Sequence, residues 1–402
     1  MRLSLRRFPA LRSKSYRQYL AGLTVSLVGT WIQQTTVALL AFRLTGSSAA
    51  VGAAIACTQL PILFLAPLAG AVNDRFDRRQ VLICTQLAGL VQAALMLAAF
   101  DAHFLGATTL FSLSLCGGVI NSLDTPARQS IVAALVDRPG DIRNAVAMNA
   151  AAIHVARLFG PAGAALLLGR WDAGPCFGAN ALSCAYFAFI LANLGVKAHV
   201  PLRRFSLGVL RDGFSYCMSH PATRQSLLWI GAASLLAIPY TSLLPAAAHH
   251  WSASAPVGYT VLMIGAGLGA FCAALTLAQI KSDVPLRRAI PVMMVLAAAC
   301  LVLLGFEGAR LSSGILIGTI ALLGFVLTMV VSGGNVIIQN SVPEALRGRV
   351  TGLFVMLFNG VAPLGSMVWG FVADRFTLAG AFMSAGAALT VVLIFNRRAT
   401  RT

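Results

Sequence analysis

Long stretches of this chain carry no formal charge, and each is long enough to cross a membrane as a helix. The segment between Arg17 and Arg43 contains 25 residues without Asp, Glu, Lys or Arg, and the segment between Arg43 and Asp74 contains 30. A bilayer core of about 30 Å requires about 20 helical residues. Only 10% of all residues are charged and 58% are hydrophobic, which leaves too little charge for a water-facing surface. Barrel strands alternate over about 10 residues, so the pattern predicts transmembrane helices.

Further charge-free segments of the same kind follow along the chain. The gap of 56 residues between Arg224 and Lys281 is long enough for two spans, which we expect to turn near His249. The stretch between Arg143 and Arg170 forms another span, in which Arg157 is the one formal charge. The sequence therefore predicts an all-α membrane protein with twelve transmembrane helices.

The basic residues are distributed unevenly between the loops that this topology creates. If the N-terminus is cytoplasmic, 25 of the 30 Lys and Arg residues lie on the cytoplasmic side, one lies within a span, and four lie outside. Cytoplasmic loops are expected to carry this excess, and an anionic inner leaflet is a suitable neighbour for it. We therefore predict a cell inner-membrane protein in contact with lipid, with both termini cytoplasmic. The net charge of +18 needs no nucleic-acid partner.

A long polar segment divides the chain near its midpoint. We expect a six-helix bundle over 1–196, a cytoplasmic linker over 197–223, and a second six-helix bundle over 224–402. Within the linker, Leu207, Leu210 and Phe214 fall at helical spacing, which predicts a short amphipathic helix at the membrane interface.

The two halves contain a matching motif in their fifth spans. Gly160-Pro161-Ala162-Gly163 corresponds to Ala362-Pro363-Leu364-Gly365, and the prolines lie 202 residues apart. Internal repeats that place a solute site at the midplane are typical of secondary transporters. The sequence thus favours two pseudo-symmetric bundles.

One cytoplasmic loop carries a dense motif, Gly70-x-x-x-Asp74-Arg75-x-Asp77-Arg78-Arg79. It resembles the signature loop of the major facilitator superfamily, although Asp77 stands where the common pattern has Gly. With Leu123-Asp124-Thr125-Pro126-Ala127-Arg128-Gln129 and Pro343-x-x-Leu346-Arg347-Gly348-Arg349, it resembles the branch of enterobactin exporters and macrolide efflux pumps. This resemblance implies the major facilitator fold and a secondary active exporter of small organic, siderophore- or drug-like molecules that works by alternating access.

The loop motif also has a physical interpretation of its own. Asp74 can lie against the positive N-terminal end of a helix that starts on the same face, either span 3 or span 11. Arg75, Arg78 and Arg79 can pair with acidic loop residues or lipid phosphate. Such a gating loop, which includes Gly70, would hold the cytoplasmic side closed.

Arg157 lies deep within its span, and His154 is on the same helical face three residues earlier. A midplane Arg costs at least about 2.5–3.5 kcal/mol and is by default a functional candidate. We expect this face to border a central cavity, where Arg157 binds an anionic solute group or influences His154. The alternative is a structural Arg that caps backbone carbonyls of a neighbouring helix.

Gly160, Pro161 and Gly163 resemble the core of the antiporter-associated motif, although the upstream glycines of that motif are Ala here. The resemblance favours protons as the coupling ion. All twelve acidic residues lie at span ends or in loops; Asp124 is the nearest carboxylate carrier, and His154 is the deep group that titrates near neutrality.

If the family arrangement applies, spans 1, 4, 7 and 10 line the cavity. Amides, hydroxyls and aromatic rings there suit an amphipathic organic solute, although each residue can equally serve interhelical hydrogen bonding. These candidates are Trp31, Gln33, Gln34, Ser114, Asn121, Tyr240, Thr241, Asn335 and Gln339.

Several motifs of other protein classes are missing from the sequence. There is no Walker A P-loop, no H-E-x-x-H and no G-x-S-x-G, which excludes the ATPases and hydrolases that use them. We therefore predict a monomeric transporter that is not an enzyme and binds no cofactor or metal. An importer of the same fold and a non-transporting membrane receptor are the remaining alternatives.

Overall fold

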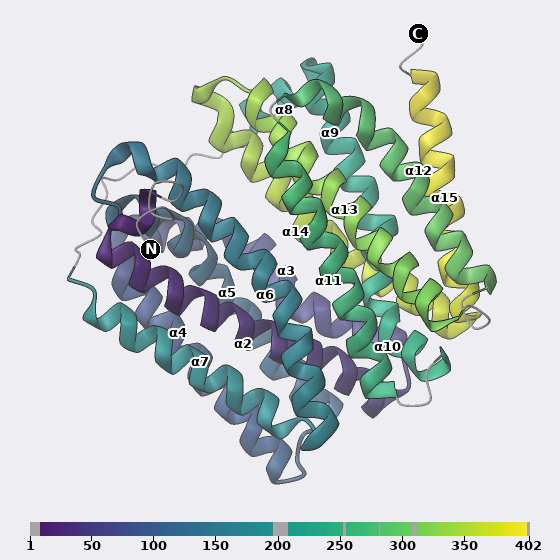
Figure 1. Ribbon diagram of the computed structural model, residues 1–402, viewed down its shortest axis with the longest axis horizontal. Coiled ribbons are helices and arrows are strands. Elements are labelled where there is room, and N and C mark those ends of the chain that lie inside the picture. Colours follow the sequence, from purple (N-terminus) through teal and green to yellow (C-terminus); the bar gives the residue numbers. More distant parts are fainter. Residues whose placement is uncertain (1–8, 196–207, 252–254, 281, 308–311, 400–402) are drawn as a thin grey trace. The chain divides into compact units, whose positions relative to one another are not determined.

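The computed structural model describes residues 9–195, 208–251, 255–280, 282–307 and 312–399, and the ordered segments in these ranges are helical. The first unit of the chain is dominated by long helices (Figure 1). These are preceded by the short helix η1 (Pro9–Arg12), and η2 (Pro139–Asp141) lies between two of them. The long helices are α2 (Lys14–Thr45), α3 (Ser48–Arg75), α4 (Arg78–Asp101), α5 (Ala107–Leu135), α6 (Ile142–Arg170) and α7 (Gly174–Asn193).

The second part of the chain begins with the short helix α8 (Gly208–Ser219). The helices that follow are α9 (Pro221–Ala232), η3 (Ala233–Ala237), α10 (Tyr240–Trp251), α11 (Ala255–Gln279), α12 (Asp283–Glu307), α13 (Ser313–Ser341), α14 (Glu344–Arg375) and α15 (Leu378–Ala399).

Within the described residues, eleven helical segments are long and apolar enough to cross a membrane, where the sequence predicts twelve. Helix α5 is not among the eleven, although it has 29 residues. Its inner half contains Asn121, Asp124 and Arg128, which lower its mean hydropathy. The twelfth span therefore remains a prediction. The helix in question is α5, which carries the buried charge of Asp124.

The predicted pair of spans in the 56-residue gap is confirmed, with an irregularity in the first. Pro221–Trp251 forms one candidate span and Val257–Gln279 the next. The first contains a π-helical turn, η3, between α9 and α10. A π-turn frees backbone groups, and the carbonyl of Leu235 in η3 accepts a hydrogen bond of 2.9 Å from the indole Nε1 of Trp369. Single π-turns within helices often mark functional positions.

The chain forms two compact units that differ from the predicted halves. Unit 1 comprises residues 1–37 and 61–205, and unit 2 comprises 38–60 and 206–402. The end of α2 and the first half of α3 thus belong with the later helices. The predicted boundaries at 196 and 223 stay a prediction, and the former falls outside the described residues.

Unit 1 is held together by contacts between neighbouring long helices. Helix α4 packs along α7 and α5 (Figure 1). Tyr16 and Tyr19 at the start of α2 are fully buried, and Phe187 of α7 lies 5.7 Å from Tyr19, centroid to centroid. The Tyr16 hydroxyl donates to the carbonyl of Ala145, which ties α2 to α6 at a distance of 2.7 Å.

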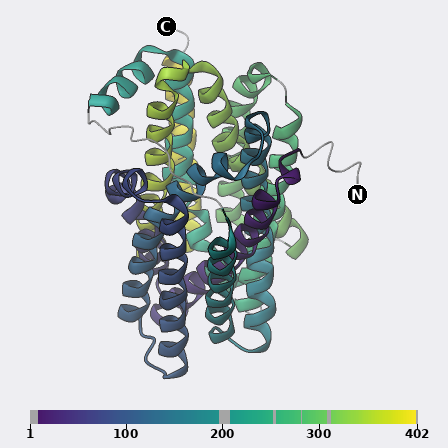
Figure 2. The same ribbon diagram turned by 90° about the vertical axis from the view of Figure 1, so that its left-hand side faces the viewer.

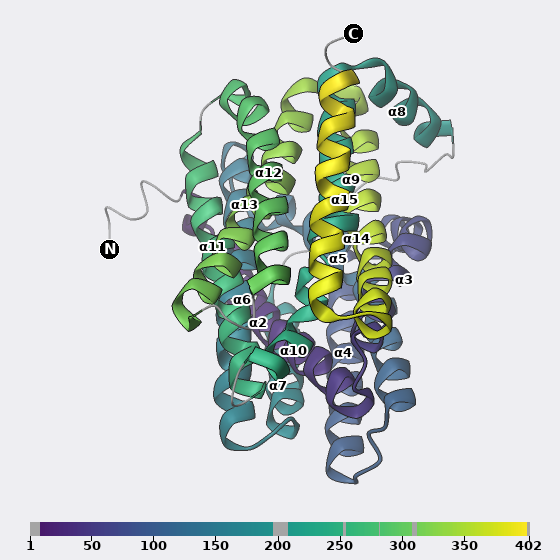
Figure 3. The same cartoon turned by 90° about the vertical axis from the view of Figure 1, so that its right-hand side faces the viewer.

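Unit 2 depends on close helix crossings at small residues. Helix α11 packs on α13, where a Cβ at Gly324 would overlap the backbone carbonyl of Ala266. Helices α12 and α15 lie side by side (Figure 3). Small residues allow such approach where no hydrophobic effect drives helices together.

The amphipathic linker helix appears as α8. Figure 2 and Figure 3 place it at the end of unit 2 where α15 ends. Cys217 is buried against α14, whereas Phe214 and Met218 are exposed. One apolar face of α8 therefore packs on α14, whereas a second face, with Phe214 and Met218, remains exposed.

Candidate functional site

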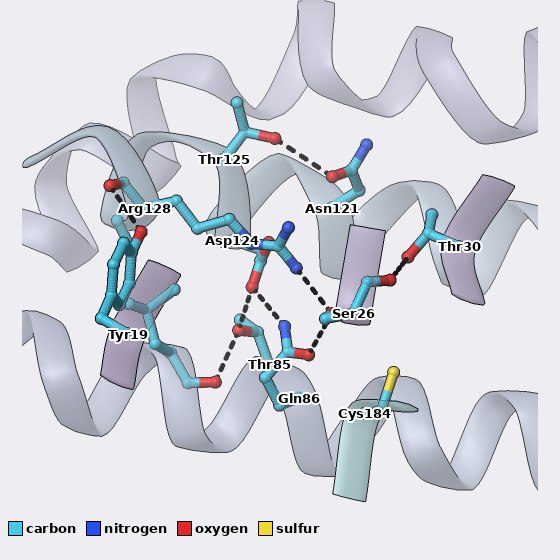
Figure 4. A network of polar contacts seen from close by, with 12 residues as sticks. Tyr19, Ser26, Thr30, Thr85, Gln86, Asn121, Asp124, Thr125, Arg128 and Cys184 are labelled. Carbon is cyan, nitrogen blue, oxygen red and sulfur yellow. Dashed lines mark hydrogen bonds and ion pairs between the residues drawn. The ribbon is translucent and has the colours of Figure 1, made fainter. Parts of the chain in front are cut away.

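The buried carboxylate of Asp124 is the centre of a polar network in unit 1. Among the described side chains it is the one charged group that is less than a tenth exposed. Arg128, one turn later on α5, forms an ion pair with it. Thr85 Oγ1 and Gln86 Nε2 of α4 donate to Asp124 Oδ1 at 2.7 and 2.8 Å (Figure 4).

The network continues to helix α2. Ser26 Oγ donates to Gln86 Oε1 at 3.0 Å and accepts from Arg128 Nη2 at 3.3 Å. The Tyr19 hydroxyl donates to the Arg128 carbonyl at 3.1 Å (Figure 4). Arg128 also lies over the Phe187 ring of α7, 5.5 Å from its centroid. A single ion pair thus joins four helices of unit 1.

The Asp124 carboxylate is thus surrounded by one opposite charge and two hydrogen-bond donors. A buried ion pair stabilises the fold only while both partners are present. Removal of either Asp124 or Arg128 would therefore leave the other charge buried without compensation.

A second polar cluster lies where α6 crosses α2. The guanidinium of Arg157 lies over the indole of Trp31, 5.2 Å from the ring centroid, a cation–π contact. Gly160, one turn later, is needed because a Cβ there would overlap the backbone and Cβ of Trp31. His154 Nδ1 is buried and has no hydrogen-bond partner within the described part of the chain. This crossing therefore brings together a cation, an aromatic face and an unsatisfied imidazole.

Gln33 faces the interior of unit 1. It donates to Gln92 Oε1 at 3.0 Å and accepts from Asn180 Nδ2 at 2.8 Å. The structure thus gives its amide interhelical partners, as the alternative interpretation of the sequence expects. Gln34 and Asn121 are half-buried, and Asn121 Oδ1 accepts from Thr125 at 3.1 Å.

The residues of the signature loop hold helix ends. Asp77 caps α4 by accepting from the backbone of Arg79 at 2.8 Å. The Arg79 side chain donates to the carbonyls of Leu191 and Ala192 at the end of α7, the former at 2.6 Å. These positions explain the run of charges as capping groups.

The rest of the loop is arranged as follows. Arg78 donates to the Ser130 carbonyl of α5 at 2.9 Å, and Arg75 is exposed. Gly70 and Asp74 lie in the last turns of α3, and the side chain of Asp74 is outside the described residues.

In unit 2, the predicted solute residues have different surroundings. Tyr240 is buried at the start of α10, and Thr241 donates to the Ile238 carbonyl at 3.1 Å. Gln339 donates to Thr351 at 3.1 Å. Asn335 Oδ1 is buried without a hydrogen-bond partner among the described residues.

The sequence analysis named Asp124 but not its partners. Arg128, Thr85, Gln86 and Ser26 come from three helices, and only the first could have been found, because an acid and a base four residues apart share a helix face. The other three are ordinary polar residues in apolar spans, with no local pattern that distinguishes them.

The fold and these buried polar groups define a class. Among the described residues, no group of three His, Cys, Asp or Glu side chains could hold a metal ion. Helices of spanning length with a charged network inside them are typical of a multi-pass membrane transporter. The chain is a transporter of small solutes and not an enzyme.

The family is shown by a match over residues 6–401 to the model described as transmembrane secretion effector. The chain belongs to this family of the major facilitator superfamily, and the resemblance drawn from the loop motifs is confirmed.

Two curated relatives are similar over most of their length. The Staphyloferrin A transporter of Staphylococcus aureus is 25% identical over 381 residues, which are 92% of this chain and 93% of the relative. The multidrug efflux pump Tap of Mycobacterium tuberculosis is 24% identical over 352 residues, 84% and 82% of the two chains. Among solved structures, the nucleoside transporter NupG superposes with a TM-score of 0.73 at 15% identity, covering 95% of this chain and 98% of NupG. That likeness concerns the fold.

Proposed function

We propose that this protein is a secondary active exporter of small organic molecules, which moves them across the inner membrane by alternating access in exchange for protons. The single observation that carries the proposal is the buried Asp124–Arg128 ion pair, hydrogen-bonded by Thr85 and Gln86. We further propose that the protein has twelve spans, and that α5 is the twelfth although its polar residues lower its mean hydropathy. We also propose that it is a lipid-embedded monomer with both termini in the cytoplasm.

The proposed coupling follows from competition between a proton and Arg128 for the carboxylate of Asp124. A proton that binds Asp124 removes the charge that holds Arg128, and the guanidinium then lacks its partner in a low-dielectric interior. Because such a cation is costly when unpaired, the helices α2, α4 and α5 shift to give it new partners. His154 on α6 is the second candidate carrier, since its Nδ1 has no competing hydrogen bond among the described residues.

The solute class rests on the Arg157 crossing and on the relatives. A guanidinium over the Trp31 face suits a ligand that combines an acidic group with a ring. The names of the Staphyloferrin A transporter and the efflux pump Tap favour siderophore- or drug-like molecules.

The cytoplasmic gating role of Asp74 is also a proposal. Asp77 already caps α4, the third span. The N-terminal end of that span therefore already has a capping carboxylate without Asp74.

The experiment uses the full chain in proteoliposomes with a pH step across the membrane and two probes, the dye Hoechst 33342 and a radiolabelled catechol carboxylate. An exporter coupled to protons moves at least one probe against the direction of the proton gradient. Liposomes carrying Asp124→Asn at equal protein density are the control. Movement of probe with the proton gradient would instead support the importer alternative, and no movement of either probe would support a receptor.

A further inference from the structure

The sequence Gly-x-x-x-Asp-Arg of the signature loop occurs a second time. Gly70, Asp74 and Arg75 end helix α3, and Gly370, Asp374 and Arg375 end helix α14, 300 residues later. Helix α14 runs from the face where α3 ends toward the face where α3 begins. The second copy therefore lies on the membrane face opposite to the signature loop.

The carboxylate of Asp374 caps the start of α3. Its Oδ1 accepts from the backbone N–H of Ser48 at 2.7 Å, and its Oδ2 accepts from the N–H of Ala49 at 3.0 Å and from Ser47 Oγ at 2.5 Å. Free N–H groups and the positive end of the helix dipole make this a favourable place for a carboxylate. The cap comes from a different helix, so it joins α3 to α14.

Glycines allow this contact. A Cβ at Gly370 would lie 2.5 Å from the Ser48 carbonyl oxygen, and a Cβ at Gly52 would lie 2.8 Å from the backbone nitrogen of Met367. Any side chain at either position would push the two helices apart. The carboxylate and the close crossing thus depend on each other.

We propose that Asp374 is an outer latch, a second copy of the signature-loop device on the opposite face, which must release α3 whenever the transporter opens to that side. The inference rests on the alternating access proposed above. Segment 38–60 stays within unit 2 because this latch, with the crossing around Gly52, holds it there.

Hydrogen exchange of the peptide 44–52 tests the cap without any transport. Asp374→Ala should raise the exchange rate of the Ser48 and Ala49 amides by about tenfold, since exposed helix-end amides open freely. Asp374→Asn, which keeps one acceptor, should raise it less. Asp101→Ala, at the same end of α4 in unit 1, is the matched control and should leave the peptide unchanged.

A reversible cross-link tests the gate. In a chain with Cys84, Cys116 and Cys272 replaced by Ala, the pair Ser47→Cys and Asp374→Cys should form a disulfide under mild oxidation that stops probe transport, and reductant should restore it. Unchanged exchange in Asp374→Ala, or full transport by the oxidised pair, would overturn the latch. If the reduced chain moves neither probe, the proposed exporter function fails, and the exchange rates still decide whether Asp374 holds α3.

Discussion

Helices α6 and α14 occupy matching places in the two halves but carry different chemistry. Alignment of Pro161 with Pro363 places His154 and Arg157 of α6 opposite Met356 and Asn359 of α14. In unit 1, the crossing pairs Arg157 with Trp31. In unit 2, Gly365 approaches Leu235 and the neutral indole of Trp369 satisfies the freed carbonyl.

The fourth helix of each half shows the same difference. Helix α5 contains the buried Asp124–Arg128 pair, whereas the buried polar groups described on α13 are neutral, namely Thr319, Thr328 and the amide oxygen of Asn335. The contrast supports our proposal that unit 1 carries the coupling chemistry, while unit 2 supplies neutral packing and a bent helix. The predictions below test this division, from the largest expected effect to the smallest.

Breaking the buried ion pair should have the largest effect. Asp124→Leu leaves Arg128 buried without its partner, a loss of about 3–5 kcal/mol of stability, so the melting temperature in detergent should fall clearly. The double variant Asp124→Leu with Arg128→Met should recover most of it. Thr328→Val on α13 is the matched control; a similar fall there would erase the contrast between the units.

Replacing Arg157 should come next. Arg157→Gln removes the cation over Trp31 but keeps a polar side chain, and we expect at least about tenfold slower transport of an anionic probe, equivalent to about 1.4 kcal/mol. Asn359→Gln at the matching position of α14 should have little effect. Initial rates at several pH values provide the measurement, and equal rates for wild type and Arg157→Gln would remove Arg157 from the solute site.

Filling the glycine positions at the two crossings should be costly in both units. Gly160→Ala drives a methyl into Trp31, and Gly365→Ala drives one into the Leu235 carbonyl; overpacking costs about 1–3 kcal/mol. We expect lower melting temperatures for both. Gly169→Ala and Gly318→Ala, where a Cβ would meet nothing within 4 Å, should melt like wild type, and a similar fall in them would contradict the packing argument.

The π-turn contact should contribute less. Trp369→Phe removes the hydrogen bond to Leu235 and keeps most of the ring, so we expect a loss of about 0.5–1.5 kcal/mol. Trp171→Phe, on an exposed indole, is the control for the ring change. Identical melting of Trp369→Phe and wild type would show that water satisfies the carbonyl equally well.

The smallest effect concerns the thiol of the linker helix. Burial raises the pKa of Cys217, so less of it is thiolate at pH 8, and the thiolate is the reactive form. Iodoacetamide should modify Cys217 more slowly than the cysteine introduced by Phe214→Cys at an exposed position of the same helix, as followed by mass spectrometry. Equal rates would mean that α8 detaches from α14.

The sequence predicts the membrane fold well because uncharged length alone requires helices. It singles out Arg157 because charge within a span is rare, and it names Asp124 only as the carboxylate nearest to a span interior, although the structure buries it within α5. It does not predict that Asp77 and Arg79 cap helix ends, because capping depends on which ends meet. The sequence does not predict Thr85 and Gln86 as partners of Asp124 for a similar reason. The role of a polar residue in an apolar helix depends on which helix packs against it.

The outer latch also illustrates this limit. Asp374 and Arg375 follow Gly370 as Asp74 and Arg75 follow Gly70, yet only the pairing of α14 with the start of α3 gives the second copy a partner. Sequence repetition alone would not indicate which helix end it holds.

The central claim is that the Asp124–Arg128 pair couples proton movement to solute movement, and one measurement tests it most directly. Proton flux and probe flux are recorded together in the same proteoliposomes for wild type and for Asp124→Asn. The account predicts a fixed proton-to-probe ratio in wild type, and in the variant probe exchange that continues down its own gradient without proton flux. A variant that still moves protons and probe at the wild-type ratio would contradict it.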